Sequence, residues 1–284
     1  MAVHGVDLSE NNGAVDFAAL QAAGAEFVLL RCGYGNDLAE QDDKRFLENV
    51  RKARDFGLPW GVYLYSYAMT AGEAESEAAH ALRLLEQAGK PPYGVWFDME
   101  DADGYKAARG MPSNGELVEF CRIFCQRMEA AGYYAGVYAS ASWFTHQLNS
   151  PKLDPYDKWV AHWAAQCGYQ GSYGIWQHTD RWVIGGKAFD GNWAYKDYPA
   201  LTGAGDKEES AMTETQVRAL AREEIQAYFR EREALPPSDW ARGDLARSQQ
   251  EGILLGDKDG GLRPRAFLTR EEAAALANRI LDAR

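Results

Sequence analysis

Short apolar segments recur along the first 202 residues, and longer amphipathic segments separate the early ones. The apolar segments are residues 4–9, 25–32, 60–67, 93–100, 133–140, 158–164, 173–179 and 186–192. Residues 42–56, 71–88 and 113–131 place Ala, Leu, Glu and Arg at helical spacing. This alternation predicts an α/β fold, and eight strands would close its sheet into a barrel. The last three segments lie too close together for crossover helices. We therefore predict a (β/α)8-type barrel that is regular over its first five units and irregular over its last three.

The composition of the chain changes near residue 203. Residues 203–211 are small and polar, as in a linker, and residues 1–202 form the predicted barrel domain. In the segment 212–284, apolar residues recur at helical spacing over 213–231, and a Pro-Pro pair follows that helix. A compact tail of about fifty residues comes next. The sequence thus predicts a small helical module after the barrel.

Composition and charge exclude several classes of protein. With 46% hydrophobic residues the chain of 284 residues can bury a full core, and no apolar run is long enough to span a membrane. The net charge of -12 argues against nucleic acid as the main partner. The first ten residues lack a basic segment followed by an apolar run, so no signal peptide is expected. The four cysteines show neither a CxxC pair nor metal-ligand spacing, which predicts reduced thiols and no metal site.

Carboxylates stand at the ends of three predicted strands. Asp7 ends the first segment, Asp98 and Glu100 end the fourth, and Asp190 lies near the end of the eighth. Active residues of a parallel barrel lie at the carboxyl ends of its strands. Because Asp98 and Glu100 are two residues apart, strand periodicity points both to one face. Two like charges at that distance resist joint ionisation, so one member is expected to stay protonated near neutral pH, as a general acid requires.

An isolated Asp-x-Glu has a simpler explanation. Asp98 or Glu100 would then cap the following segment or pair with Arg31. Aromatic residues at or just beyond the strand ends favour a site instead, because sugar rings stack their C–H faces on aromatic rings. Those included in the predicted cleft are Tyr34, Tyr65, Tyr138 and Trp163.

Several motifs together resemble family 25 glycoside hydrolases, the N,O-diacetylmuramidase lysozymes of phage endolysins and bacterial autolysins. They are GVDLSENNGAVDF at the start, WFDMED, GVYAS, IWQHT and AFDGN, in this order over residues 3 to about 198. The resemblance implies a β/α barrel with an irregular end. It also implies hydrolysis of the β-1,4 bond from N-acetylmuramic acid to N-acetylglucosamine in bacterial peptidoglycan, without a cofactor.

The resemblance also implies roles for the acidic residues. Glu100 would give a proton to the leaving oxygen, and Asp98 would orient the 2-acetamido group whose carbonyl attacks the anomeric carbon. Asp7 and Asp190 would hold this pair and tune its ionisation. The tyrosines Tyr65 and Tyr138 would line the cleft, and Arg31 stands where family members often carry a basic residue. Strand spacing alone leaves the stereochemical outcome open, because it fits either class of carboxyl separation.

The tail resembles a single S-layer homology repeat. Trp240 opens its first helix, and Thr269 caps the second with Glu272 as capping-box partner. Such repeats bind secondary cell-wall polymers, and Arg270 of the TREE segment would lie near the anionic ligand. These repeats usually come in threes and this chain has one, so association of chains through the helix over 213–231 is the alternative role.

Two other functions stay open at this stage. One is a non-catalytic lectin that binds the cell wall on a barrel fold, and the other is a chitinase-like hexosaminidase. The presence of both Asp98 and Glu100 argues against the lectin. The leading hypothesis is a phage or prophage endolysin, made in the host cytoplasm and released to the wall through a holin. The alternative is a host autolysin that is exported by another route and acts outside the cell.

Overall fold

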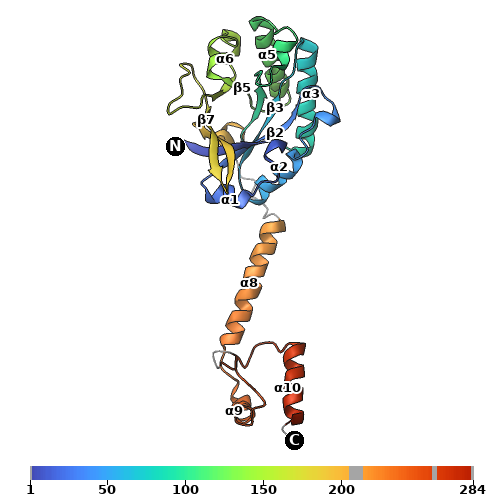
Figure 1. Cartoon of the computed structure of the whole chain (residues 1–284), viewed down its shortest axis with the longest axis vertical. Coiled ribbons are helices and arrows are strands. Elements are labelled where there is room, and N and C mark those ends of the chain that lie inside the picture. Colours follow the sequence, from blue (N-terminus) through green and yellow to red (C-terminus); the bar gives the residue numbers. More distant parts are fainter. Residues whose placement is uncertain (1, 205–213, 258–260, 283–284) are drawn as a thin grey trace. The chain divides into compact units, whose positions relative to one another are not determined.

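Eight strands close into a barrel in the computed structural model, which describes residues 2–204, 214–257 and 261–282 (Figure 1). The strands are β1 (Val3–Leu8), β2 (Phe27–Tyr34), β3 (Trp60–Tyr65), β4 (Val95–Asp98), β5 (Ala135–Ser140), β6 (Asp157–Ala161), β7 (Ile175–Ile184) and β8 (Lys187–Ala194). Neighbours from β1 to β7 pair in parallel. Each predicted apolar segment therefore overlaps one strand, and the prediction of an α/β barrel is confirmed.

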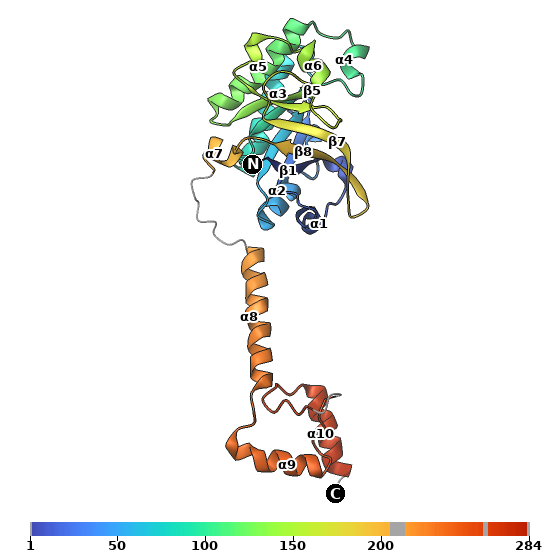
Figure 2. The ribbon, with the colours of Figure 1, turned by 90° about the vertical axis from the view of Figure 1, so that its left-hand side faces the viewer.

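The eighth strand runs against its neighbours. β8 pairs antiparallel with both β7 and β1, and the β7–β8 hairpin is prominent in Figure 2. Only Gly185 and Gly186 separate the two strands, and both have positive φ, at 57° and 80°. Two such residues form the tight turn that reverses a strand in a hairpin. The placement of Asp190 at the carboxyl end of a parallel strand was therefore wrong: it lies within β8, opposite Asp7 of β1.

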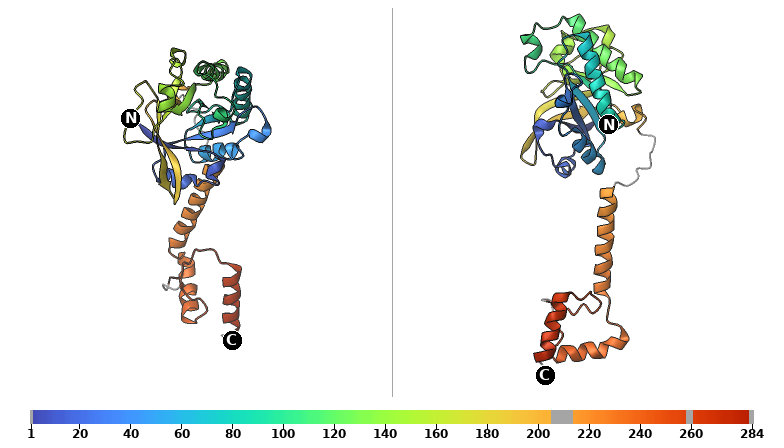
Figure 3. Two further views of the ribbon diagram at one scale, coloured as in Figure 1. Left: turned by 45° about the horizontal axis from the view of Figure 1, so that its top comes forward. Right: turned by 90° about the vertical axis from the view of Figure 1, so that its right-hand side faces the viewer.

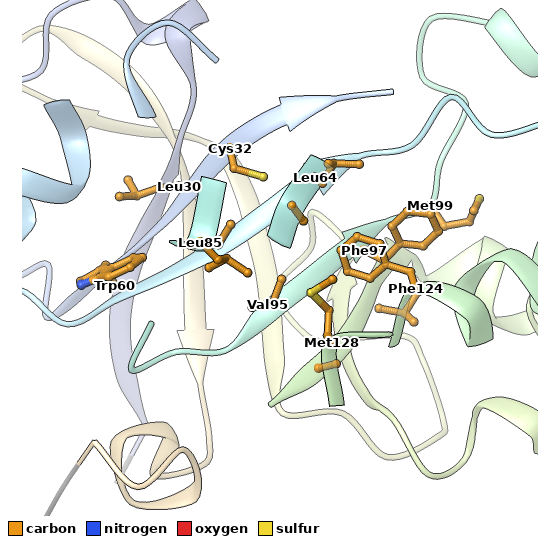
Figure 4. Close-up of a cluster of buried hydrophobic side chains, with 14 of the residues drawn as sticks. Leu30, Cys32, Trp60, Leu64, Leu85, Val95, Phe97, Met99, Phe124 and Met128 are labelled. Carbon is orange, nitrogen blue, oxygen red and sulfur yellow. The ribbon is translucent and has the colours of Figure 1, made fainter. Parts of the chain in front are cut away.

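The helices of the regular half lie outside the strands. Those of the barrel unit are α1 (Phe17–Ala22), α2 (Phe46–Asp55), α3 (Ala71–Ala88), α4 (Tyr105–Ala108), α5 (Asn114–Ala130), α6 (Ala141–Thr145) and α7 (Tyr198–Leu201). Figure 4 shows the contact layer, in which Phe97 of β4 stacks on Phe124 of α5 with ring centroids 4.3 Å apart. Val95 and Met99 are buried in the same layer, so these alternate residues of the β4 segment face the helices.

A second apolar cluster fills the inside of the barrel. Trp96 is fully buried there, edge-on to Trp159 of β6, with ring centroids 6.2 Å apart. A β-carbon added at Gly136 of β5 would lie 2.4 Å from the Trp96 ring, so only glycine leaves room for this indole. The barrel interior is thus a packed core, not a channel.

The β7–β8 hairpin extends from the barrel (Figure 3). Side chains on the outer face of β1, β7 and β8 stack on one another there. The His4 ring lies between those of Trp182 and Trp193, with centroids 3.8 and 4.2 Å away, and its Nε2 is 2.9 Å from Nε2 of His178. Burial and His178 lower the pKa of His4 to about 4. This stack covers apolar surface in the irregular part of the barrel.

The chain divides into two compact units, Met1–Ala211 and Met212–Arg284, and the second consists of helices and loops. Its helices are α8 (Glu214–Ala234), α9 (Arg242–Gln250) and α10 (Arg270–Asp282). The predicted capping box is confirmed, because the Glu272 carboxylate accepts from the Thr269 N–H and the Thr269 hydroxyl accepts from the Glu272 N–H. Of the predicted linker, residues 205–211 lie outside the described residues.

No helix in the described ranges is long and apolar enough to cross a membrane. The cysteines are free thiols; Cys32, Cys121 and Cys125 are buried, and Cys167 is partly exposed.

Candidate active site

Asp98 is the last residue of β4, and Glu100 lies two residues beyond it in the chain. Asp98 is 4% exposed, and Glu100 is half-buried just beyond the strand. Neither caps the next helix: Asp101 does so, with its carboxylate accepting from the N–H groups of Lys106 and Ala107. The simpler explanation by capping therefore does not apply to this pair.

A buried donor and a buried acceptor lack partners at this strand end. Within the described part of the chain, neither Oδ1 of Asp98 nor the hydroxyl of Tyr65 has a hydrogen-bond partner. Tyr65 is the last residue of β3 and lies beside Asp98 in the sheet register. Buried polar atoms are normally paired, so this arrangement is open to the hydrogen bonds of a ligand.

Burial sets the ionisation of the pair. Burial and the charge of Glu100 raise the pKa of Asp98 well above its usual value. Burial also raises the pKa of Glu100, to about 7, with Asp190 and Asp103 adding to the rise and Lys106 opposing it. A carboxylic acid with a pKa of about 7 still holds its proton at mildly acidic pH, as a general acid requires.

A second carboxyl pair joins Asp7 to Asp190 across the β1–β8 register. Burial raises the pKa of both carboxyls, and the charge of Asp190 raises that of Asp7 further. Oδ2 of Asp7 also accepts from Nε2 of Gln177 at 2.9 Å and from Nδ2 of Asn192 at 2.8 Å. Asp7 is thereby held in one orientation at the barrel mouth.

Two of the predicted cleft aromatics bind the same glutamine. The Tyr138 hydroxyl and the Trp163 indole N–H each donate to Oε1 of Gln177 at 3.0 Å. Tyr138 is buried, whereas Trp163 exposes 59% of its surface. Gln177 thus links an exposed indole to Asp7. Sequence reasoning missed Gln177, although it shares the inward face of β7 with buried Ile175, where a polar residue signals a site.

The predicted basic residue lies beside the site but has its own partners. Nε of Arg31 donates to Asp43 at 2.9 Å, and its Nη2 lies 3.4 Å from Glu10. Its guanidinium lies 5.7 Å from the ring centre of Tyr34, the last residue of β2. The alternative ion pair between Arg31 and the Asp98–Glu100 pair is therefore not formed.

Lys106 was not predicted, and it is fully buried beside the pair. Its Nζ donates to the backbone carbonyl oxygens of Ser66 and Glu100, the latter at 2.8 Å. Nothing in the local sequence signals burial, because the lysine stands in a polar loop on a helix of four residues. Arg270, the predicted polymer-binding residue, belongs to the other unit, where it is the exposed first residue of α10.

Both units of the chain match known protein families. The family model for glycosyl hydrolases family 25 matches residues 6–187, and that for the S-layer homology domain matches residues 235–274. The chain is 26% identical over 202 residues to the probable GH family 25 lysozyme 2 of Dictyostelium discoideum, a match covering 68% of this chain and 91% of the relative. It is 25% identical over 183 residues to the autolytic lysozyme of Clostridium acetobutylicum, covering 64% and 52%.

A solved structure shows the same fold. The modular autolysin LytC from Streptococcus pneumoniae, in complex with a synthetic peptidoglycan ligand, matches with a TM-score of 0.62 at 24% identity. The match covers 68% of this chain and 47% of LytC, so the chain spans about half the length of the clostridial and pneumococcal proteins. The family 25 model, by contrast, covers well over half of the present sequence and includes Asp7, Asp98 and Glu100. The chain therefore belongs to glycosyl hydrolases family 25, and its second unit carries an S-layer homology domain.

Proposed function

We propose that the chain hydrolyses bacterial peptidoglycan at the β-1,4 bond from N-acetylmuramic acid to N-acetylglucosamine. The observation that carries the proposal is the buried Asp98 carboxyl, whose Oδ1 has no partner among the described residues. A carboxylate in that position can accept a hydrogen bond from the N–H of a 2-acetamido group. Glu100 lies two residues away, and burial raises its pKa to about 7. The autolysin solved with a peptidoglycan ligand has the same fold.

The proposed reaction has two steps. In the first, the acetamido carbonyl oxygen attacks the anomeric carbon while Asp98 orients the acetamido N–H. Glu100 gives its proton to the glycosidic oxygen, and the leaving sugar departs with a new hydroxyl group. In the second, the Glu100 carboxylate takes a proton from water, whose oxygen attacks the same carbon and reopens the oxazolinium ring. Two inversions retain the anomeric configuration.

The other site residues surround the catalytic pair and would contact the substrate or affect the ionisation of the pair. The Asp7–Asp190 pair borders the catalytic pair, because the charge of Asp7 acts on Asp98 and that of Asp190 acts on Glu100. Trp163 offers an exposed ring for a sugar face, with Tyr34 and Tyr65 at the ends of adjacent strands.

Product analysis tests the bond that is cut. Purified peptidoglycan and chitin are incubated separately with the protein, the new reducing ends are reduced with borohydride, and the labelled sugars are identified by mass spectrometry. We expect reduced N-acetylmuramic acid from peptidoglycan. Reduced N-acetylglucosamine would support a chitinase-like hexosaminidase, and no release from either polymer would support a lectin.

The rate of glycan hydrolysis is expected to show a bell-shaped pH profile with an acidic-to-neutral optimum. Because burial raises the pKa of Glu100 to about 7, its proton is lost and activity falls as the pH rises through neutrality. Activity falls on the acidic side when the carboxylate partner becomes protonated, so both limbs belong to the coupled pair. Values of kcat/KM on soluble glycan fragments check this. Activity that climbs steadily into alkaline conditions is incompatible with a carboxylic acid donor.

We also propose that the C-terminal unit anchors the enzyme to a secondary cell-wall polymer, with Arg270 at the binding site. The S-layer homology match supports this assignment. Overall charge does not, because residues 206–284 carry 13 basic and 16 acidic side chains, a net charge of -3, against an anionic wall. Binding then depends on local groups such as the exposed Arg270 guanidinium.

Deletion of residues 207–284 is expected to leave a folded barrel that still cuts soluble glycan fragments, because the barrel core forms within residues 2–204. Activity on intact walls should fall by at least about tenfold, since tethering raises the local enzyme concentration. Sedimentation with cell walls checks the anchor, with Arg270→Ala in the full chain as the matched variant. Equal sedimentation of truncated and full-length protein would refute it.

A homo-oligomer through α8 is the companion proposal. Ile225 and Tyr228 lie one helical turn apart and are 54% and 55% exposed. A second copy of the chain covering them would bring several single S-layer homology repeats together, which strengthens weak binding. Light scattering of the full chain and of Tyr228→Glu tests this, and a monomer at all concentrations would contradict it.

For the protein's origin we propose a phage or prophage endolysin that reaches the wall by holin-type release. The membership of family 25 supports it, because the lysozymes of that family include those of phage endolysins. Expression in the cytoplasm of a susceptible host should lyse cells only when a holin is co-expressed. Lysis without a holin would refute this route.

A further inference from the structure

A lysine ammonium is buried against the catalytic end of the barrel. Lys106 is 0% exposed, although it lies in the loop that follows β4. Its Nζ donates to the carbonyl oxygens of Ser66, just after β3, and of Glu100, just after β4. Lys106 therefore ties the ends of two neighbouring strands together and fixes the backbone of Glu100 itself.

The charged and titratable groups facing Lys106 are mostly acidic. They are Glu77 of α3, Asp98 of β4, Glu100, Asp101 and Asp103 of the following loop, Tyr65 of β3 and Cys121 of α5. The Glu77 carboxylate accepts from the Ser66 hydroxyl at 2.8 Å and from the Tyr67 N–H at 2.6 Å. The opposite charges of Glu77 and Lys106 thus hold the loop after β3 between them.

Hydrogen bonding alone does not explain a lysine here. A neutral amide also donates to two carbonyl oxygens, and its burial carries a smaller desolvation cost than that of an ammonium ion. The charge has a use, however, beside two carboxyl groups whose pKa values burial raises. Among the neighbouring charges that lower the pKa of Asp98 and of Glu100, that of Lys106 has the largest effect on both. Arg31 also acts on Asp98, but its guanidinium is paired with Asp43 and Glu10.

We propose that Lys106 is the positioning residue of the catalytic pair: it fixes the Glu100 backbone and supplies the positive charge that lets one carboxyl of the pair ionise while the other keeps its proton. This inference rests on the proposed hydrolysis by Asp98 and Glu100. Lys106 acts through these carboxyls and touches no substrate atom. Without its charge, both groups stay protonated to higher pH, and the carboxylate that orients the acetamido group is missing at acidic pH.

The test compares pH profiles of Lys106→Gln and the wild-type full chain on soluble peptidoglycan fragments. Loss of an adjacent positive charge should move both limbs to higher pH by on the order of one unit. On the acidic limb this shift reduces kcat by about tenfold at a given pH, with a smaller change in KM. Lys158→Gln is the matched control, since Lys158 near the start of β6 is also buried and its Nζ donates to the carbonyl oxygen of Leu153. It should keep the wild-type profile.

Three outcomes decide the matter. The inference is supported if both limbs of the pH profile shift to higher pH in Lys106→Gln and in Lys106→Met. A lower kcat with unmoved limbs would overturn it and leave Lys106 a structural role. If neither neutral variant folds while Lys106→Arg folds, the charge serves stability and the inference fails. The wild-type reaction tests the proposed function separately, because the sugar released at the reducing end does not depend on any Lys106 variant.

Discussion

Glu100→Gln is expected to abolish wall lysis while the barrel stays folded. The change is nearly isosteric but removes the proton that the leaving oxygen needs, and general acid catalysis typically contributes roughly 10²–10⁴-fold. The fold should persist because Lys106 binds the backbone carbonyl of Glu100, which the substitution keeps. Turbidity clearance of cell walls and release of reducing ends measure activity, and a thermal melt confirms folding.

The control for this variant is Glu48→Gln. Glu48 lies on the surface of α2 with Lys52 and Arg45 as partners, so the same chemical change there should leave lysis unaltered. Near-wild-type clearance by Glu100→Gln would remove Glu100 from the mechanism. A melt far below that of the wild type would instead assign the loss to misfolding, and the soluble fraction would then have to be assayed per folded molecule.

The regular part of the fold was predictable because local pattern and tertiary structure agree there. Residues 71–88 and 113–131 were predicted as helices, and α3 (Ala71–Ala88) and α5 (Asn114–Ala130) match them closely. Residues 42–56 were also predicted as one helix, but α2 begins at Phe46. Asp42 and Asp43 are used elsewhere, as partners of Arg83 and Arg31, and such tertiary ion pairs leave no periodic signal.

The direction of β8 illustrates a different limit. Its apolar pattern predicted a strand, but a strand's periodicity is the same whether it runs parallel or antiparallel. The signal for reversal was the Gly185–Gly186 pair, whose positive φ values form a two-residue hairpin turn. Asp190 still lies beside Asp7, because the antiparallel register places the two opposite each other.

Some residues of the candidate site can likewise be predicted from the sequence, and others cannot. Carboxylates at strand ends are visible in the sequence, since the barrel topology brings the ends of successive strands together. Gln177 was recognisable in principle, as a polar residue on an inward strand position. Lys106 was not, because its burial depends on how the loop after β4 folds over the end of β3, and the sequence 101–110 carries no pattern for that.

Asp98→Asn is expected to lower kcat by about 10²-fold or more while making the protein more stable. The amide cannot offer the charged acceptor that orients the acetamido group, and removal of one preorganised electrostatic contact typically costs about that much. Stability should rise because Asp98 is buried and its Oδ1 has no partner among the described residues. A neutral group loses less free energy than a carboxylate on burial there.

The stability gain of Asp98→Asn should itself depend on pH. Burial raises the pKa of Asp98 above its usual 3.8, so the folded chain binds more protons than the unfolded chain above that pH, and wild-type stability falls as the pH rises. The variant lacks this group, so its gain in Tm should be present at neutral pH and vanish below about pH 4. Asp157→Asn is the matched control: that buried carboxylate accepts from Tyr134 and Tyr198 and pairs with Lys196, so its loss should reduce Tm and leave kcat unchanged. A fall in Tm for Asp98→Asn at neutral pH would show that Asp98 is a satisfied structural carboxylate, and its proposed role at the acetamido group would fail.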